Sequence, residues 1–388
     1  MKKISGNNLT AGMFSQNFKE TVKTFIANDE AFNFMNTMKG TPAYWKKFLL
    51  EVLAMVKQLG VPTFFFTLSC ADLRWFELPF ILSKLYNINL SDSEINEMSY
   101  EDRCRYLNMN PVFTARHFQY RFECFFKEII LNGPLGKVKY HVIRVEFQVR
   151  GSPHVHVFLW ITDPVILTKD NKEEYIAFVD RIIRADLPDK ELEPELFNLV
   201  KTYQLHAHSK TCRKYKNEIC RFHFGKYFTD RTIIASPLSD ELDEDTKNEI
   251  LQKRKSILDK VKEYIDEYLF PRKHNVIDPS KANFEEPETI QQILHKLDLT
   301  EEVYYKALSI SKDTDFDIYL RRPPNSCFVN NYFAEGLRAW EANMDIQPVF
   351  NEYKAITYLC KYLTKSEDEC SQAMKQALNE GKENKKQI

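Results

Sequence analysis

The segment between Tyr140 and Ile161 constrains the fold most strongly, because it has the pattern of a β-hairpin. Apolar and polar residues alternate from Tyr140 to Val149, as is typical of a strand with one buried face. Every second residue from Ile143 to Val149 falls on the apolar face, and every second residue from Val142 to Gln148 on the other. The turn residues 151–153 then lead into His154–Ile161, a second strand. We therefore predict an antiparallel sheet with one solvated face.

Two histidines begin the second strand of this hairpin. One residue separates His154 from His156, so both side chains point to the same face. A pairing that sets Gln148 opposite His154 also sets Glu146 opposite His156, with Cβ atoms about 5 Å apart. Two imidazoles with a carboxylate or amide oxygen would leave open positions for a catalytic divalent cation. The alternative is that the two histidines lie on a solvated strand face without binding a metal.

Composition limits the class of protein. The chain has 388 residues, 44% of them hydrophobic and 13% aromatic, which is ample for a globular protein of two or three domains. Its formal charge of −1 provides no global attraction to nucleic acid, so a polyanion site must be a local patch. No apolar run approaches the about 20 residues of a membrane span, and no targeting or secretion signal is seen. The eight scattered cysteines favour a reducing compartment.

Periodicity predicts the remaining elements. Helices are expected over Tyr44–Leu59, over Asp72–Leu85 and from Pro111 to about Leu131, and a buried strand over Thr63–Ser69. Residues 163–200 look helical and acidic, and 240–310 look like charged helix with a proline-containing connector at 271–287. The middle of the chain therefore has the character of an insertion. No phosphate-binding loop of the G-x-x-x-x-G-K-[ST] type occurs in the sequence.

A helix is also predicted over Tyr353–Lys365, and its polar side carries two tyrosines. Ile356, Leu359, Cys360 and Leu363 would form the apolar side, and the opposite side carries Tyr358, Lys361, Tyr362 and Lys365. The tyrosines, four residues apart, are neighbours on a helix surface. Lysines beside a phenol favour its phenolate form and attract phosphate. Ordinary core packing of both rings is the alternative.

Histidines, cysteines and basic residues gather between residues 201 and 231. His206, His208, Cys212 and Cys220 supply two imidazoles and two thiolates, which suits a closed tetrahedral zinc site, with His223 close behind. The same stretch has eight basic residues against two acidic ones, a local charge of +6 that suits phosphate contact. The candidate DNA contacts are Lys210, Arg213, Lys214 and Arg221. Free buried cysteines with exposed histidines are the alternative.

Taken in order, these motifs resemble the Helitron helicase-like domain of Helitron transposases, a branch of the HUH endonucleases. The resemblance extends over most of the chain. It is carried by Gly40-Thr-Pro-Ala-Tyr-Trp45, Phe66-Thr-Leu-Ser-Cys-Ala-Asp-Leu-Arg-Trp75, Asn110-Pro-Val-Phe-Thr-Ala-Arg-His-Phe118, Arg144-Val-Glu-Phe-Gln-Val-Arg-Gly-Ser-Pro-His-Val-His156, the His/Cys stretch, Asn330-Asn-Tyr332, Trp340-Glu-Ala-Asn-Met-Asp-Ile-Gln347 and Tyr358-Leu-Cys-Lys-Tyr-Leu-Thr-Lys365.

The resemblance implies a nuclear enzyme that nicks and rejoins single-stranded DNA at transposon ends. His154 and His156 would hold Mg²⁺ or Mn²⁺, with Glu146 or Gln148 as third ligand. Tyr358 and Tyr362 would be paired nucleophiles that form 5′-phosphotyrosine. The His/Cys stretch would be a zinc element that contacts DNA. A non-catalytic remnant that binds single-stranded DNA, and a metal phosphodiesterase that activates water, are the competing interpretations.

The resemblance also implies an α+β fold with an HUH core interrupted by insertions. The expected parts are an N-terminal helical segment (1–60), the first part of the core (61–165), a helical connector (166–200), the zinc-binding element (201–231), a charged helical insertion (232–310), the second part of the core with the tyrosine helix (311–366) and a polar tail (367–388). Helitron proteins carry a helicase region after the tyrosines, whereas this sequence ends at Ile388. The expectation is a fragment or a decayed copy, with the helicase encoded separately or lost.

Overall fold

The computed structural model describes residues 37–38, 41–88, 90–147, 151–207, 212, 220, 222–269, 272–273, 276–277 and 288–350. The chain divides into two compact units, one of residues 1–62 with 352–388 and one of residues 63–351. Each unit is described by itself. None of the helices within the described ranges is both long enough and apolar enough to cross a membrane.

The described part of the first unit is dominated by helix α4 (Pro42–Leu59), which confirms the helix predicted there. Its start is fixed by two local signals. The Thr41 side chain accepts a hydrogen bond from the Tyr44 amide, and proline occupies the first turn, where its missing N–H costs nothing. Gly60, with a φ of 79°, ends the helix.

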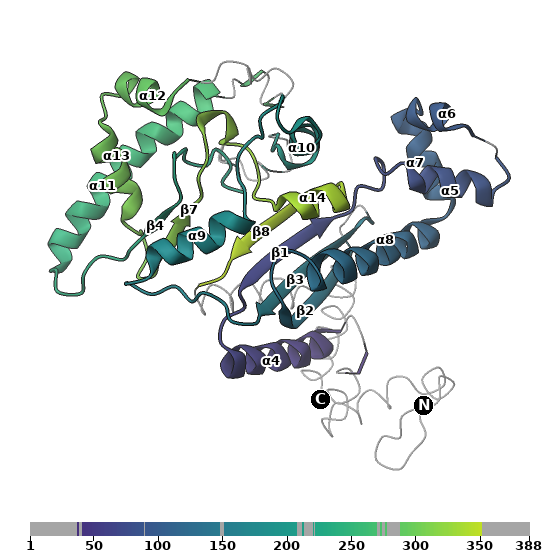
Figure 1. Cartoon of the computed structure of the whole chain (residues 1–388), viewed down its shortest axis with the longest axis horizontal. Coiled ribbons are helices and arrows are strands. Elements are labelled where there is room, and N and C mark those ends of the chain that lie inside the picture. The colour runs from purple at the N-terminus through teal and green to yellow at the C-terminus, as the bar shows by residue number, and fades with distance from the viewer. Residues whose placement is uncertain are drawn as a thin grey trace, which may run out of the picture. The chain divides into compact units, whose positions relative to one another are not determined.

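The second unit is built on a four-stranded antiparallel sheet with the order β2-β3-β1-β8 (Figure 1). The strands are β1 (Phe64–Ser69), β2 (Val138–Phe147), β3 (Pro153–Ile161) and β8 (Met344–Pro348). The strands predicted near residues 62–70 and 140–161 are confirmed. Strand β8 was not predicted, although it completes the sheet beside β1.

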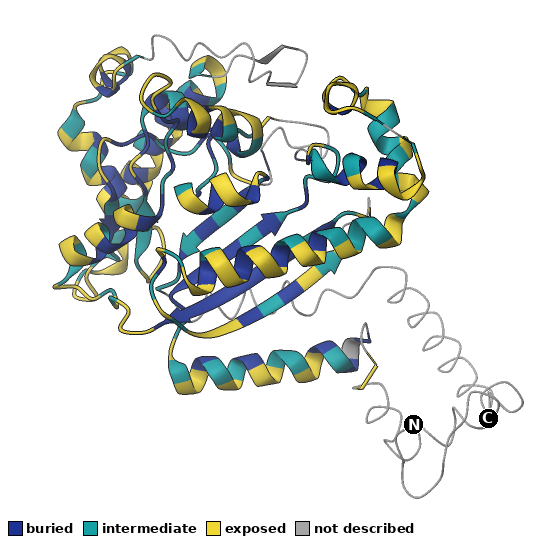
Figure 2. Cartoon of the chain, turned by 45° about the vertical axis from the view of Figure 1, so that its right-hand side comes forward, coloured by how far each residue is buried: buried dark blue, intermediate teal, exposed yellow. Residues whose placement is uncertain are grey.

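One face of the sheet is packed into an apolar core. Alternate residues of β1, β3 and β8 meet α8 (Pro111–Phe125), α9 (Lys172–Ile182), α10 (Pro194–Leu199) and α14 (Ala334–Trp340) in a single cluster. Phe64 stacks on Phe178 with ring centroids 5.6 Å apart, and Phe125 lies 5.3 Å from Trp340. Helix α8 buries one side against this cluster and exposes the other (Figure 2).

A second apolar core lies away from the sheet. It joins α11 (Glu244–Tyr264), α12 (Ile290–Lys296) and α13 (Glu301–Ser309) around the buried rings of Phe228 and Tyr304.

The further elements are α5 (Glu77–Leu85), α6 (Asp92–Asn96), α7 (Tyr100–Met109), η1 (Phe126–Leu131), η2 (Val200–Gln204), η3 (Ile265–Leu269), η5 (Pro324–Ser326), and the paired short strands β4 (Ile233–Ala235) with β7 (Asp317–Tyr319) and β5 (Arg272–Lys273) with β6 (Val276–Ile277).

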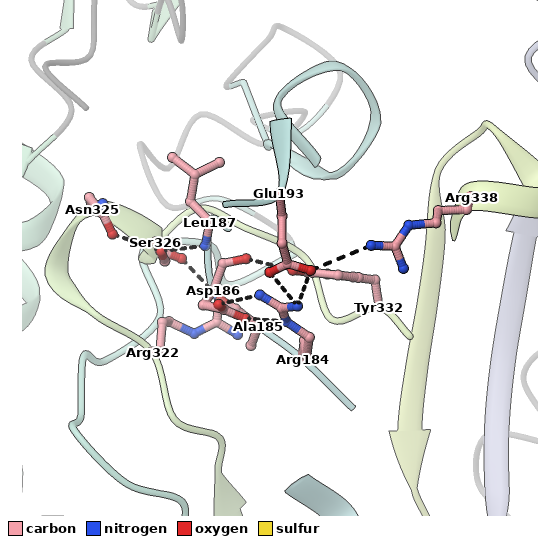
Figure 3. Close-up of polar contacts among 10 residues, drawn as sticks. All are labelled: Arg184, Ala185, Asp186, Leu187, Glu193, Arg322, Asn325, Ser326, Tyr332 and Arg338. Carbon is pink, nitrogen blue, oxygen red and sulfur yellow. Dashed lines mark hydrogen bonds and ion pairs between the residues drawn. The ribbon is translucent and has the colours of Figure 1, made fainter. Parts of the chain in front are cut away.

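A polar network joins the segments around residues 185 and 326, which both precede β8 in the sequence (Figure 3). The buried Arg322 guanidinium donates to the carbonyls of Ala185 and Ser326 at 3.1 and 2.9 Å. Nearby, Arg184 forms an ion pair of 2.9 Å with Asp186 and another of 2.9 Å with Glu193. Because buried charges are tolerated only when they are hydrogen-bonded, these contacts fix the segments around residues 185 and 326 relative to each other.

Two helical predictions need correction. The helix expected from Asp72 begins only at Glu77, because the chain first makes a turn in which the amides of Arg74 and Trp75 both donate to the Ala71 carbonyl. The long helical stretch expected over 163–200 is interrupted, with α9 ending at Ile182 and α10 beginning at Pro194. The α+β class and the antiparallel sheet are confirmed.

Candidate functional site

The predicted face of the hairpin is correct, but the predicted register is not. Glu146, rather than Gln148, pairs with His154, and Arg144 pairs with His156. The shift is two residues, so every side chain keeps its face. The final pair is Phe147 with Pro153, and a proline at the first position of a strand removes no ladder hydrogen bond from its interior. The amide of Gln148 lies outside the described residues.

His154, His156 and Glu146 lie on the same face of the sheet in spite of this shift. Nε2 of His156 lies 3.3 Å from Oε2 of Glu146, and the two imidazole centroids are 4.7 Å apart. Toward the neighbouring strand β1, Nδ1 of His154 lies 3.2 Å from Oγ of Ser69, the residue with which His154 pairs. Two imidazoles and a carboxylate on adjacent strands form a donor set that fits a divalent cation.

This face of the sheet is less solvated than expected. His156 is only 3% exposed, and the ring of Phe65 stacks on it with centroids 6.1 Å apart. Phe158 and Trp160, further along β3, are also buried, at 2% and 4% exposure. The face is therefore polar at the hairpin end and apolar beyond it. The sequence carries a sign of this change, because Phe158 and Trp160 are apolar at the positions that continue the face of His154 and His156.

The loop after β1 is tied to the end of the hairpin. Oγ of Ser152 donates to Oδ2 of Asp72 at 2.9 Å, while Oδ1 of Asp72 accepts from the Leu73 amide at 3.0 Å. Ser152 lies two residues before His154. This contact holds the turn over the carboxyl end of β1, beside Ser69.

Strand β8 adds a carboxylate to the same face. Asp345 pairs with Thr67, and Thr67 pairs with His156 on its other side. Burial raises the pKa of Asp345 to about 6, while Gln347, Lys226 and Arg322 act in the opposite direction. Sequence analysis missed this residue. The available signal was the alternation of the apolar Met344 and Ile346 with the polar Asp345 and Gln347.

The structure brings three residues of the predicted His/Cys site together. The ligand atoms of His206, Cys212 and Cys220 all lie within 4.8 Å of one another. Sγ of Cys220 is 3.4 Å from Nε2 of His206, and Cys212 and Cys220 are buried at 1% and 6% exposure. Burial raises the pKa of the Cys220 thiol. One imidazole and two thiols fit three of the four positions of a tetrahedral zinc site. The predicted fourth ligand, His208, lies outside the described residues.

Aromatic and charged groups support this cluster. The Phe224 ring stacks on His206 with centroids 4.1 Å apart and planes 7° apart. Nζ of Lys262, on α11, donates to the carbonyls of Phe224 and Gly225 at 2.6 and 2.7 Å. The His206 amide donates to the Phe328 carbonyl at 2.9 Å, which anchors the cluster beside the second core. His223 is exposed and does not belong to the group.

Several predicted residues lie outside the part of the chain that the structure describes. They are the candidate nucleophiles and their lysines, and the candidate DNA contacts: Tyr358, Lys361, Tyr362, Lys365, Lys210, Arg213, Lys214 and Arg221. Their roles stay predictions.

The fold is α+β, and within the described ranges His206, Cys212 and Cys220 are the group of side chains close enough together to hold a metal ion, while the sheet carries a histidine pair beside Glu146. Comparison with known families then identifies the N-terminal part of the chain. Residues 3–159 match the family described as the Helitron helicase-like domain at the N-terminus. The match includes Glu146, His154 and His156, and it confirms the suspected Helitron N-terminal domain over these residues. No curated protein matches the chain.

Proposed function

We propose that this protein nicks and rejoins single-stranded DNA at the ends of a Helitron transposon. One observation carries the proposal: Glu146, His154 and His156 lie on one face of the sheet, within the region that matches the Helitron helicase-like domain. These three side chains would hold Mg²⁺ or Mn²⁺. When bound, the cation supplies positive charge that polarises a scissile phosphate.

The residues around the histidines support this role. Ser69 would fix the orientation of the His154 ring through its contact with Nδ1, as partners of metal-binding histidines commonly do. Phe65 and Phe158, whose rings lie 4.7 Å apart, would exclude water on the apolar side of His156. A drier site strengthens electrostatic interactions with a phosphate.

The nucleophile would be a tyrosine, Tyr358 or Tyr362. Its phenolate oxygen attacks phosphorus and forms a 5′-phosphotyrosine bond, the bond from phosphorus to the 3′ oxygen breaks, and that oxygen leaves as a 3′-hydroxyl after taking up a proton. The reverse reaction joins strands. Lys361 and Lys365 would favour the phenolate. Tyr358 follows Pro348, the end of β8, by ten residues, and an extended chain of that length spans up to about 35 Å.

The second metal centre would be structural. His206, Cys212 and Cys220, with His208 as the predicted fourth ligand, would hold Zn²⁺ and order the surrounding basic segment. Lys210, Arg213, Lys214 and Arg221 would then contact the DNA backbone. A nuclear location completes the proposal.

A labelling experiment tests the reaction. The full chain is mixed with a pool of random single-stranded oligonucleotides and Mn²⁺, with the label at the 3′ end in one arm and at the 5′ end in the other. We expect the 3′ label on the protein and the 5′ label on a shortened free strand. The adduct should disappear in Tyr358→Phe/Tyr362→Phe and in His154→Ala. Tyr120→Phe and His295→Gln, which alter exposed residues elsewhere, are matched controls and should retain it.

The other outcomes separate the competing functions. Shortened strands without an adduct would show a phosphodiesterase that uses water. Binding to the oligonucleotides without cleavage or adduct would show a non-catalytic DNA-binding remnant. Either result would overturn the proposed nicking and joining activity.

A further inference from the structure

One lateral row of residues connects β8 to the candidate metal site. Asp345 pairs with Thr67, Thr67 with His156, and His156 with Arg144, so four strands each contribute one residue. Residues paired in an antiparallel sheet project to the same face. Asp345 therefore projects from the face that carries His154 and Glu146, although it lies almost 200 residues further along the chain.

The carboxylate of Asp345 is not fully satisfied by the described residues. Oδ2 accepts a hydrogen bond of 2.8 Å from Nε2 of Gln347, whereas Oδ1 is inaccessible to solvent and has no hydrogen-bond partner. Arg322 donates its described hydrogen bonds to carbonyls and to Asn331, not to Asp345. A buried carboxylate oxygen without a donor is costly, so it calls for a cation or a donor that binds there.

The spacing of the strands places the backbone of Asp345 within side-chain reach of His156. Adjacent strands lie about 4.8 Å apart, so the backbones of Asp345 and His156, with β1 between them, are about 10 Å apart. An imidazole, a cation and a carboxylate can span that distance when both side chains lean over Thr67. Mg²⁺ and Mn²⁺ prefer oxygen ligands, which Asp345 supplies and the two imidazoles do not.

We propose that Asp345 is an oxygen ligand of the divalent cation that binds at His154 and His156. This inference rests on the proposed function, because it concerns the same site. It assigns strand β8 a part in metal binding, so the carboxylates of two different strands, Glu146 and Asp345, would hold the cation from opposite sides of the histidine pair. The strand that precedes the predicted tyrosine helix would then be fixed by the metal itself.

The test measures Mn²⁺ binding to the zinc-loaded full chain. The concentration of free Mn²⁺ is monitored by electron paramagnetic resonance. We expect Asp345→Asn to weaken Mn²⁺ binding by about tenfold or more, as loss of metal-site partners does. Asp345→Glu, which keeps the charge and displaces the carboxylate by one methylene, should weaken it less. Asp259→Asn, on the exposed side of α11, is the matched control and should bind Mn²⁺ like the wild type.

The outcomes distinguish this inference from the proposed function. If His154→Ala loses Mn²⁺ while both Asp345 variants bind it normally, Asp345 is not a ligand and the proposed function stands. If the wild type binds no Mn²⁺, both fail. If Asp345→Asn does not fold, the glutamate variant decides alone, and unchanged Mn²⁺ affinity in that variant would overturn the inference.

Discussion

Oγ of Ser152 lies 2.9 Å from Oδ2 of Asp72 and donates a hydrogen bond to it. This contact connects the loop after β1 to the turn that precedes His154. We expect Asp72→Ala to lower the free energy of unfolding by about 1 kcal/mol, the usual contribution of such a bond. Because the turn also positions His154, Mn²⁺ binding should weaken several-fold. Chemical denaturation and Mn²⁺ titration measure the two effects.

Asp72→Asn is the matched variant for this prediction. The amide oxygen can still accept from the Leu73 amide while the amide nitrogen donates to Oγ of Ser152, so both stability and Mn²⁺ affinity should stay close to those of the wild type. Equal losses in the alanine and asparagine variants would show that the charge of Asp72, and not its contact with Ser152, matters.

A second prediction concerns His117, a histidine of α8 that belongs to neither candidate cluster. His117 lies against Trp75, with ring centroids 5.9 Å apart, and burial lowers its pKa below the ordinary 6.5. Glu77 opposes this effect and Arg121 adds to it. The unfolded chain therefore takes up a proton before the folded chain does, and stability falls as the pH drops through the ordinary pKa of histidine.

Replacement of this histidine should reduce that pH dependence. The unfolding midpoint of the wild type should be lower at about pH 5.5 than at about pH 7.5, and His117→Gln should narrow the difference. The exposed His295 on α12 provides the control, because His295→Gln should leave the difference unchanged. If the pH dependence of stability were unaltered in His117→Gln, other titratable groups would be its cause.

A third prediction concerns zinc. The purified chain should contain about one Zn²⁺, and Cys220→Ser should lose it, because the cluster would keep only one thiolate. The variant should also melt at a lower temperature, since His206 packs on Phe224 next to the second core. Cys124→Ser removes an exposed thiol and should keep the metal. Elemental analysis and thermal melting decide the question, and zinc retained by Cys220→Ser would contradict it.

The parts of the candidate site that the sequence revealed depend on short-range patterns. Because successive side chains of a strand point to opposite faces, the sequence predicted that Glu146, His154 and His156 share one face. His206, Cys212 and Cys220 were grouped because they lie close together in the sequence. The register could not be derived, because a shift of two residues leaves the faces unchanged and only the turn decides between the alternatives. Asp345 gave only a weak signal, the alternation of residues 344–347. Its strand has five residues, and its pairing with β1 spans most of the chain.

The last prediction concerns Gly225, which follows the aromatic residue that stacks on His206. Its φ is 75°, in the left-handed region that favours glycine. A Cβ atom at this position would also collide with Nζ of Lys262 and Oδ1 of Asp266, which form an ion pair of 3.2 Å. We expect Gly225→Ala to destabilise the protein by about 1–3 kcal/mol, with part of the loss due to backbone strain and part to displacement of Lys262.

A second glycine separates these two contributions. Gly151 has a φ of 89°, and a Cβ atom there would meet nothing within 4 Å. Gly151→Ala therefore measures strain without collision and should cost less than Gly225→Ala in chemical denaturation. Because Lys262 donates to the Phe224 carbonyl, displacement of its ammonium group should also loosen the ring that supports His206. Zinc should therefore dissociate faster from Gly225→Ala than from Gly151→Ala, and equal rates would show that Lys262 does not support the cluster.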